Sequence, residues 1–233
     1  MPLLNNIRRK IHQWTTPKSA FLPCPSTSSY GRSLNLSDMH LELRDVPGMI
    51  SDESGKYLFT LAFGQSLSGD IIEIGSWQGK STIYLAKSVK QTGNGRVYAI
   101  DHFQGNVGKE SAYQVGLQDL SDLESGFRTN IANKGVQDCV ELLSMPSDEA
   151  VKQLRERGVV ARLLLIDGGH RYEEVKRDFE LFSPFVQEGG LIVFDDYARH
   201  FPGVTDFIGE RFLDGAYPFY CYQKTFVLKW QKR

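Results

Sequence analysis

Short apolar runs alternate with segments of helical periodicity between about residue 50 and residue 195. The apolar runs, which we predict to be strands, cover residues 70–74, 96–101, 140–143, 162–167 and 191–195. The helical patterns between them cover residues 81–90, 120–133, 147–157 and 172–185. Nearly continuous apolar runs indicate parallel strands that are covered on both faces, and strict alternation of strand and helix is typical of right-handed βαβ units. The sequence therefore predicts a doubly wound α/β sheet with helices on both faces.

The pattern changes at both ends of this alternation. Residues 217–222 and 225–230 are two aromatic-rich runs joined by a short turn, which predicts an antiparallel hairpin at the sheet edge. Residues 1–45 hold a basic amphipathic helix pattern and then a proline- and serine-rich stretch that is typical of a linker. We therefore divide the chain into an N-terminal arm, 1–45, and one domain, 46–233. The arm's helix packs on its own domain, on a partner subunit of a homo-oligomer, or on a membrane surface, and the sequence leaves these alternatives open.

Composition limits the kinds of protein that this chain can be. Its 233 residues fit one large domain, and a hydrophobic share of 41% is enough for a core. The formal net charge of −1 gives no general attraction to nucleic acid. Three widely separated cysteines indicate neither a disulfide framework nor a metal cluster. Because the sequence has no bilayer-length apolar run and no signal-peptide pattern, we expect a soluble cytoplasmic protein without stable membrane insertion.

A glycine turn follows the first predicted strand, where residues 72–82 read IEIGSWQGKST. Ligands of doubly wound sheets bind beyond the carboxyl ends of the strands, and this turn lies there. Only three residues separate Gly75 from Gly79, whereas a phosphate-binding loop needs four. The second glycine of a dinucleotide fingerprint is also absent, and the bulky Trp77 lies within the turn. The turn therefore suits a nucleoside ligand that lacks phosphates.

Two acidic residues accompany this turn. Glu73 lies near the tip of the first predicted strand, where its charge repels a phosphate and attracts a cationic ligand. Asp101 ends the second strand, 22 residues after Gly79, at about the spacing where an acid hydrogen-bonds ribose hydroxyls. A helix-capping or ion-pair role is the alternative for Glu73. Together, the turn and the two acids predict a site for a nucleoside that carries positive charge and no phosphate.

Three aspartates lie where the fourth and fifth predicted strands end. Asp167 follows the run LLLI, and Asp195 and Asp196 follow the run LIVF. Adjacent strands lie about 4.8 Å apart, so we expect the three carboxylates to converge at one rim of the sheet. Like charges raise each other's pKa unless a cation neutralises them, and a hard divalent ion such as Mg²⁺ prefers oxygen ligands. The sequence predicts a metal site here, with helix caps or a solvated turn as the alternative.

His170 lies three residues after Asp167, in a turn that contains Gly168 and Gly169. With an unperturbed pKa of about 6.5, a histidine can take a proton from a substrate hydroxyl at neutral pH. A surface or capping role is the alternative for a lone histidine. Its place beside the predicted metal site favours the catalytic interpretation.

A nucleoside with positive charge and no phosphate is S-adenosylmethionine, and the chain from about Gly48 onward resembles the class I methyltransferases that use it. In that family the final hairpin completes a Rossmann-like sheet of seven strands. By this resemblance Ser81 would meet the cofactor carboxylate, Asp101 the ribose and Ser147 the adenine. The cofactor-binding residues that the resemblance implies are Glu73, Gly75, Ser76, Trp77, Gly79, Ser81, Asp101, His102, Ser147 and Asp167.

Two further motifs resemble the metal-dependent O-methyltransferases of natural-product sugars, of the macrocin and mycinose type, and more distantly the catechol-type enzymes. They are D-G-G-H-x-Y-x-x-V-x-x-D-F, from Asp167, and G-G-L-I-V-F-D-D-Y, from Gly189. The resemblance implies Mg²⁺ or another divalent ion at Asp167, Asp195 and Asp196, with His170 and Asp167 catalytic. Catechol-type enzymes place a lysine where this chain has His170, and the sugar-modifying relatives a histidine. We therefore expect a small hydroxylated acceptor such as a sugar, a glycoside or another diol.

Other functions stay open at this point. One is a nucleotide- or NAD(P)-binding enzyme of the P-loop or Rossmann type, against which the spacing of the glycines argues. Another is a non-catalytic protein that binds S-adenosylmethionine or acts as a scaffold. Nucleic-acid methylation is disfavoured by the neutral charge. Acceptor specificity is expected in residues 104–118, in residues 197–201 and in the N-terminal arm.

Overall fold

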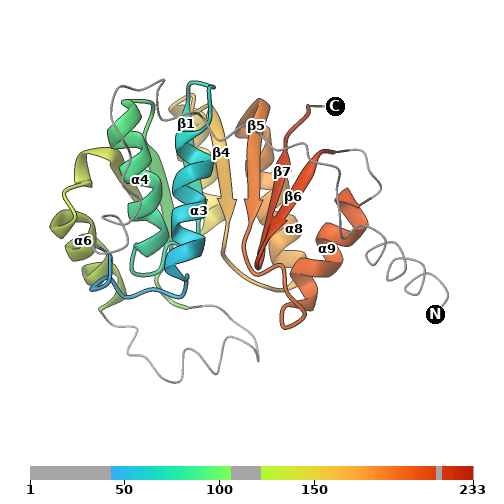
Figure 1. The fold of residues 1–233 in the computed structure, drawn as a ribbon, viewed down its shortest axis with the longest axis horizontal. Coiled ribbons are helices and arrows are strands. Elements are labelled where there is room, and N and C mark those ends of the chain that lie inside the picture. Colours follow the sequence, from blue (N-terminus) through green and yellow to red (C-terminus); the bar gives the residue numbers. More distant parts are fainter. Residues whose placement is uncertain (1–42, 106–121, 214–216, 233) are drawn as a thin grey trace. The chain divides into compact units, whose positions relative to one another are not determined.

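The computed structural model describes residues 43–105, 122–213 and 217–232, whose strands form a single sheet (Figure 1). The strand order is β3-β2-β1-β4-β5-β7-β6 in a seven-stranded sheet. The first five strands pair in parallel, and β7 is antiparallel to both β5 and β6. This confirms the predicted doubly wound sheet with a hairpin at its edge. The strands are β1 (Asp70–Ile74), β2 (Val97–Asp101), β3 (Val140–Ser144), β4 (Ala161–Ile166), β5 (Val186–Phe194), β6 (Phe219–Tyr222) and β7 (Thr225–Lys229).

Helices cover both faces of the sheet, as predicted (Figure 1). One face packs against buried side chains of α7, α8 and α9. On the other, α3 packs along α4, and α6 lies beside the first turn of α4. Two short 3-10 helices cover Gln137–Cys139 and Ser183–Phe185. The α-helices are α3 (Asp52–Phe63), α4 (Lys80–Thr92), α6 (Leu123–Asn133), α7 (Ser147–Glu156), α8 (Tyr172–Phe182) and α9 (Pro202–Phe212).

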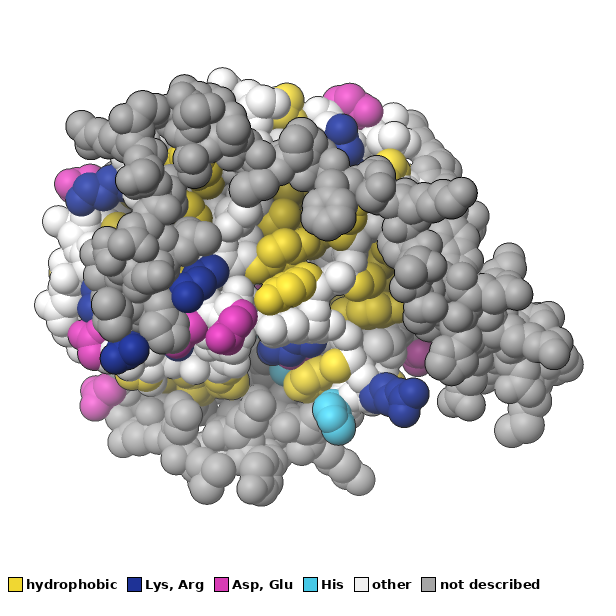
Figure 2. Space-filling model, in the orientation of Figure 1, with side chains coloured by type: hydrophobic (Ala, Val, Ile, Leu, Met, Phe, Trp, Pro, Cys, Tyr) yellow, Lys and Arg dark blue, Asp and Glu magenta, His cyan; other side chains and the backbone are white. Residues whose placement is uncertain are grey.

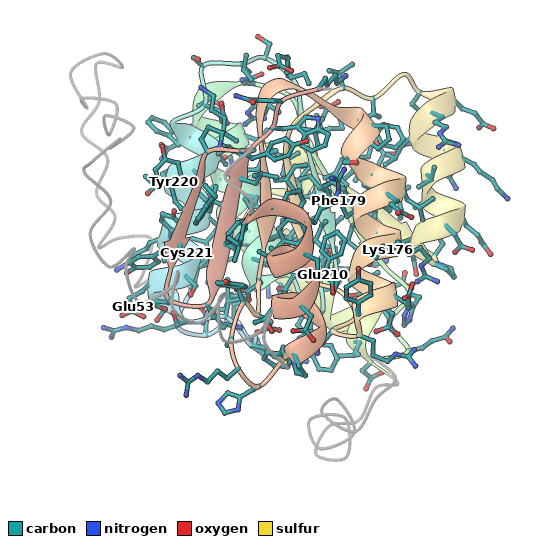
Figure 3. The ribbon with its side chains drawn as sticks, turned by 90° about the vertical axis from the view of Figure 1, so that its right-hand side faces the viewer. Glu53, Lys176, Phe179, Glu210, Tyr220 and Cys221 are labelled. Carbon is teal, nitrogen blue, oxygen red and sulfur yellow. The ribbon has the colours of Figure 1, made fainter. Side chains whose placement is uncertain are left out.

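Strand alternation sorts the core into these two layers. In β1, Ile72 and Ile74 join the apolar cluster beneath α7, α8 and α9, whereas Glu73 between them points toward α4. An aromatic cluster that includes Phe179 of α8 (labelled in Figure 3) joins α8 and α9 to β5. The ring centroids of Phe179 and Phe212 are 5.3 Å apart, and those of Phe194 and Phe212 are 5.8 Å apart. This packing fixes the carboxyl end of β5, from which two of the predicted metal ligands emerge.

Strand β5 begins five residues earlier than the predicted 191–195. Gly189 and Gly190, which in the sequence look like a turn before that strand, lie within it. Gly189 has a φ of +78°, and the pairing of β4 with β5 shifts register between Ala161 and Leu163. The glycine pair therefore forms a bulge that continues the strand.

Several expectations fall on residues that the structure does not describe. The predicted arm, residues 1–45, lies almost entirely outside the described ranges, as does most of the 104–118 segment. None of the helices within those ranges has the length and apolarity that a membrane span requires. Acidic and basic side chains are interspersed on the face shown in Figure 2.

Candidate active site

The carboxyl ends of the parallel strands surround a cavity of about 290 Å³. It is lined by the segment before α3, by the glycine turn after β1, by residues after β2, β4 and β5, and by the β6–β7 turn. The structure thus brings both halves of the predicted site to one cavity. The predicted residues that line it are Gly75, Ser76, Trp77, Ser81, Asp101, His102, Asp167, His170, Asp195 and Asp196.

The glycine turn takes a left-handed backbone at three positions. The φ angles are +84° at Gly75, +46° at Trp77 and +87° at Gly79. A Cβ atom on Gly75 would lie 2.1 Å from the carbonyl oxygen of Asp167, so only glycine fits there. The turn is therefore packed directly against the backbone that follows β4.

Glu73 lies beneath the turn, fully buried, and is not part of the cavity lining. Its Oε2 accepts hydrogen bonds from Ser76 Oγ at 3.0 Å and from Thr82 Oγ1. Burial raises its pKa to about 7, although hydrogen bonds from the hydroxyls of Ser81, Thr82 and Ser76 act in the opposite direction. Glu73 therefore lies beside the turn, as predicted from its place on the strand, and fixes the turn to the start of α4.

Asp101 binds the same turn from β2. Its Oδ2 accepts from the backbone N–H groups of Ser76 and Trp77 at 2.9 and 2.8 Å, and its Oδ1 accepts from the N–H of Phe103 at 2.7 Å. A carboxylate has about four acceptor positions, so Asp101 keeps about one of them while it holds the turn. His102, next to it, also lines the cavity.

Two other predicted cofactor residues, Gly79 and Ser147, are not among the residues that line the cavity. Gly79 packs on α6, where an added Cβ would lie 3.0 Å from the ring of Phe127. Ser147 starts α7, and its hydroxyl donates to Asp178 Oδ1 at 2.7 Å. The hydroxyl of Ser147 thus joins α7 to α8, and Ser147 is not among the residues that line the cavity.

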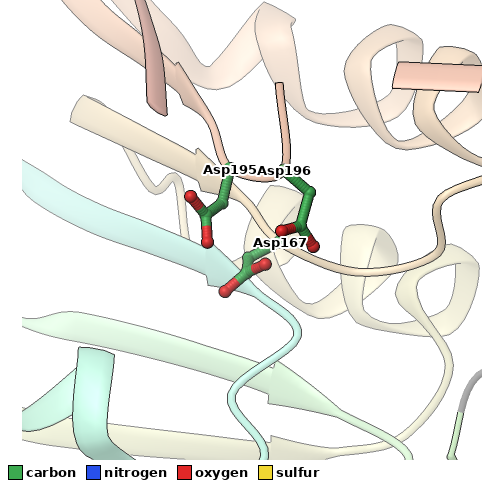
Figure 4. Close-up of side chains that lie close together, drawn as sticks. All are labelled: Asp167, Asp195 and Asp196. Carbon is green, nitrogen blue, oxygen red and sulfur yellow. The ribbon is translucent and has the colours of Figure 1, made fainter. Parts of the chain in front are cut away.

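Three carboxylates of the cavity lining lie close together (Figure 4). Asp167, Asp195 and Asp196 each offer an oxygen atom, and these atoms all lie within 4.8 Å of one another. Asp196 has a φ of +57°, a strained conformation that turns its side chain toward the other two. The convergence expected from the parallel strands is therefore present. The sequence alone could not show this backbone strain.

Two basic side chains bind this acidic cluster. His170 Nε2 lies 2.9 Å from Asp196 Oδ2, and the imidazole packs against the ring of Phe201 at a centroid distance of 4.3 Å. Lys224 Nζ lies 2.9 Å from Asp195 Oδ2 and 2.6 Å from Asp196 Oδ1. Sequence reasoning missed Lys224. The sequence feature that could have predicted its position is the C-terminal hairpin. Because β7 pairs with β5, the turn before β7 lies next to the aspartates after β5.

The family of the protein follows from its sequence match. Residues 72–197 match the model of a family described as "Methyltransferase domain", which covers both the glycine turn and the acidic cluster. The chain belongs to this methyltransferase family. Its fold is the class I fold of S-adenosylmethionine-dependent methyltransferases, as the resemblance predicted. The predicted alternative of a P-loop or NAD(P)-binding enzyme is thereby set aside.

Solved methyltransferases share this fold at low sequence identity. An O-methyltransferase from Bacillus cereus, in complex with SAH, is 16% identical with a TM-score of 0.60, and the match covers 97% of both chains. TomG from Streptomyces achromogenes, involved in tomaymycin synthesis and in complex with SAM, is 20% identical with a TM-score of 0.57 over 87% of this chain and 93% of that chain. CalS11, a TDP-rhamnose 3'-O-methyltransferase, is 16% identical with a TM-score of 0.53 over 89% and 100%.

A curated viral protein matches only a short stretch. Uncharacterized protein R132 of Acanthamoeba polyphaga mimivirus is 54% identical over 35 residues, which are 15% of this chain and 16% of the viral protein. The match therefore spans about a sixth of that relative.

The pKa values of the three aspartates in the methyltransferase site shift in different directions. Burial raises the pKa of Asp167, and the charges of Asp195 and Asp196 raise it further. Burial also raises the pKa of Asp195, against the effect of Lys224. At Asp196 burial acts in the same direction, but the bonds with His170 and Lys224 outweigh it and the pKa is lowered. The side of the cluster at Asp167 is therefore short of positive charge.

Proposed function

We propose that this methyltransferase transfers a methyl group from S-adenosylmethionine to a hydroxyl of a small molecule, with a divalent cation bound by Asp167, Asp195 and Asp196. One observation carries the proposal: the glycine turn and the acidic cluster with His170 line the same cavity. Methyl transfer needs the donor and the acceptor within contact distance, and a shared cavity provides for that.

The cofactor half of the proposal rests on the turn and its acid. Ser76, Trp77, Ser81 and Asp101 line one side of the cavity, and two backbone N–H groups of the turn are already fixed by Asp101. A preorganised turn loses little conformational entropy when a ligand binds. The proposed arrangement has the adenosyl group against Asp101 and His102, with the sulfonium methyl directed to the acidic side.

The acidic cluster suits a hard cation. Its donors are three carboxylates with atoms within 4.8 Å of one another, which is the ligand type that Mg²⁺ prefers. Mutual repulsion and burial raise the pKa of Asp167, so an added positive charge there would be stabilised. When bound, the ion would supply a charge that favours the deprotonated form of the acceptor hydroxyl.

His170 is the proposed base. Its Nε2–H donates to Asp196, which leaves Nδ1 as the proton acceptor of the ring. Nδ1 is buried and has no hydrogen-bond partner among the described residues, so the bound acceptor must place its hydroxyl directly against the ring. The hydroxyl proton of the acceptor passes to Nδ1 as the oxygen forms a bond to the methyl carbon. The S–C bond breaks, its electron pair stays on sulfur, and the neutral thioether S-adenosylhomocysteine is left.

The proposed acceptor is a sugar, a glycoside or a similar natural-product diol. His170 supports this choice, because catechol-type enzymes are expected to carry a lysine at that position. Two structural neighbours support a natural-product acceptor: CalS11 is a TDP-rhamnose 3'-O-methyltransferase, and TomG is involved in tomaymycin synthesis. Mixed apolar and polar side chains line this part of the cavity, among them Met49, His200 and Phe201.

Calorimetry and an acceptor screen test the proposal. S-adenosylhomocysteine should bind the wild-type protein, and Asp195→Ala should bind it within about threefold of wild type. With an acceptor found by screening sugars, glycosides and diols, chelation or Asp195→Ala should lower the rate by about 100-fold or more. Unchanged turnover in excess chelator would remove the metal from the proposal. Cofactor binding without methylation of any acceptor would instead favour a non-catalytic binding protein.

A further inference from the structure

Lys224 reaches the acidic cluster from a short turn. Only Gln223 and Lys224 separate β6 from β7. The ammonium of Lys224 bridges Asp195 and Asp196 at 2.9 and 2.6 Å, and 33% of its side chain is exposed, compared with 6% and 10% for the two aspartates. The protein chain thus places a permanent positive charge on two of the three proposed metal ligands.

The remaining oxygens of these two aspartates also have donors. Asp195 Oδ1 accepts from Thr225 Oγ1 at 3.2 Å, and Asp196 Oδ2 lies 2.9 Å from His170 Nε2. Three of the four oxygens of the pair thus have a hydrogen-bond donor or a histidine partner within the protein, and Asp195 Oδ2 has the ion pair with Lys224 but no hydrogen bond among the described residues. A divalent ion that binds both aspartates must replace at least one donor or lie close to the ammonium.

The backbone of Lys224 is held while its side chain has a path to solvent. The N–H of Tyr197 donates to the carbonyl of Lys224 at 2.7 Å. The neighbouring Gln223, with a φ of +52°, accepts through Oε1 from Ser54 Oγ of α3 at 3.3 Å. The turn is thus fixed on both sides, and the flexible four-carbon stem of the lysine is the part that can withdraw.

We propose that Lys224 is an internal counter-ion that competes with a divalent cation for Asp195 and Asp196. This inference rests on the proposed metal site and adds a determinant of its affinity. Two positive charges within a few ångströms repel each other strongly where the surroundings are buried. Binding of the metal to both aspartates therefore requires the Lys224 ammonium to leave the pair. This competition lowers the affinity of the acidic cluster for divalent cations.

Metal binding, measured without turnover, tests the inference. Mn²⁺ is titrated into the full-length protein at pH 8, and the free ion is counted by its paramagnetic resonance signal. Lys224→Met, which keeps an apolar stem and removes the charge, should bind Mn²⁺ at least about tenfold more tightly than wild type. Lys224→Arg keeps the charge and should bind no more tightly than wild type. Lys176→Met, on α8 (Figure 3), removes the same charge elsewhere and should leave the affinity within about twofold.

The outcomes separate this inference from the proposed function. Equal or weaker Mn²⁺ binding by Lys224→Met overturns the inference, and the metal site stands if wild type still binds better than Asp195→Ala. If neither wild type nor Lys224→Met binds better than Asp195→Ala, both the inference and the proposed metal are overturned. Lys224→Gln serves as a second neutral variant if thermal melting shows that Lys224→Met does not fold.

Discussion

The bond from His170 to Asp196 decides which ring nitrogen can act as a base. Because Nε2 lies 2.9 Å from the carboxylate, the neutral imidazole is expected to carry its proton on Nε2 and to leave Nδ1 free. Two-bond ¹H–¹⁵N spectra of the histidine rings should show this tautomer for His170 in the wild type, and Asp196→Ala should remove the preference. The opposite tautomer in the wild type would contradict the proposed role of Nδ1.

The same arrangement predicts the rate of a base-free variant. His170→Gln keeps a polar side chain but cannot take up a proton, so kcat should fall by about 10²- to 10⁴-fold. Binding of S-adenosylhomocysteine should change little, because the glycine turn and Asp101 are untouched. Initial rates with the acceptor from the screen, together with calorimetry, measure the two effects separately. A loss of cofactor affinity equal to the loss of rate would indicate a structural role for His170.

A residue of the site can be predicted from the sequence when its position depends only on the end of a predicted strand. Asp167, Asp195 and Asp196 follow parallel strands, and the rim of a parallel sheet brings such residues together. Lys224 was not predictable in this way, since its place depends on the pairing of β7 with β5. The sequence places Glu73 on the correct strand and beside the glycine turn. Its burial under the turn depends on the hydroxyls of Ser76 and Thr82, which spacing does not reveal.

Among the elements, the turn after β1 is the most constrained by packing. Gly75→Ala would force a Cβ to within 2.1 Å of the Asp167 carbonyl oxygen at a φ of +84°, so the backbone after β4 must shift. S-adenosylhomocysteine affinity should fall by about tenfold or more, with a loss of stability of about 2–4 kcal/mol. Calorimetry and chemical denaturation measure both quantities.

Gly93 provides the matched control for that substitution. It has a φ of +65° at the end of α4, and an added Cβ would meet nothing within 4 Å. Gly93→Ala should therefore show the backbone strain alone, about 1 kcal/mol, with unchanged cofactor affinity. Equal effects of the two substitutions would show that strain rather than the contact with β4 decides the outcome.

The helices and strands that the sequence predicts have a clear local pattern of apolar residues, and those that it does not predict lack one. The buried parallel strands are continuous apolar runs, so β1 has its predicted bounds, 70–74. Helices α3 and α9 were not predicted. Helix α3 contains Gly55, where an added Cβ would lie 2.0 Å from the ring of Tyr84. Helix α9 contains Gly203 and Gly209. These residues lower helix propensity, and the helices form because tertiary packing compensates.

Across the whole molecule, buried acids set the pH dependence of stability. Burial raises the pKa values of Glu73, Asp167, Asp178 and Asp195 in the folded protein. A group with a raised folded pKa holds more protons in the folded than in the unfolded state, so its contribution is present below its unfolded pKa and lost as pH rises through its folded pKa. These four groups therefore favour folding at acidic pH, and Asp196, whose pKa is lowered, acts in the opposite direction.

Glu73 allows this dependence to be measured, because its pKa moves from 4.5 to about 7. At about 1.4 kcal/mol per pH unit, its ionisation should remove about 3 kcal/mol of unfolding free energy between pH 4.5 and pH 7. Glu73→Gln should remove that loss, so its stability should fall by about 3 kcal/mol less than wild type from pH 4.5 to pH 8 in urea denaturation. Glu156→Gln, at an exposed position on α7, should follow the wild-type curve. A wild-type curve for Glu73→Gln as well would mean that the pKa of Glu73 is the same in the folded and the unfolded protein, because the hydroxyls of α4 and the turn offset its burial.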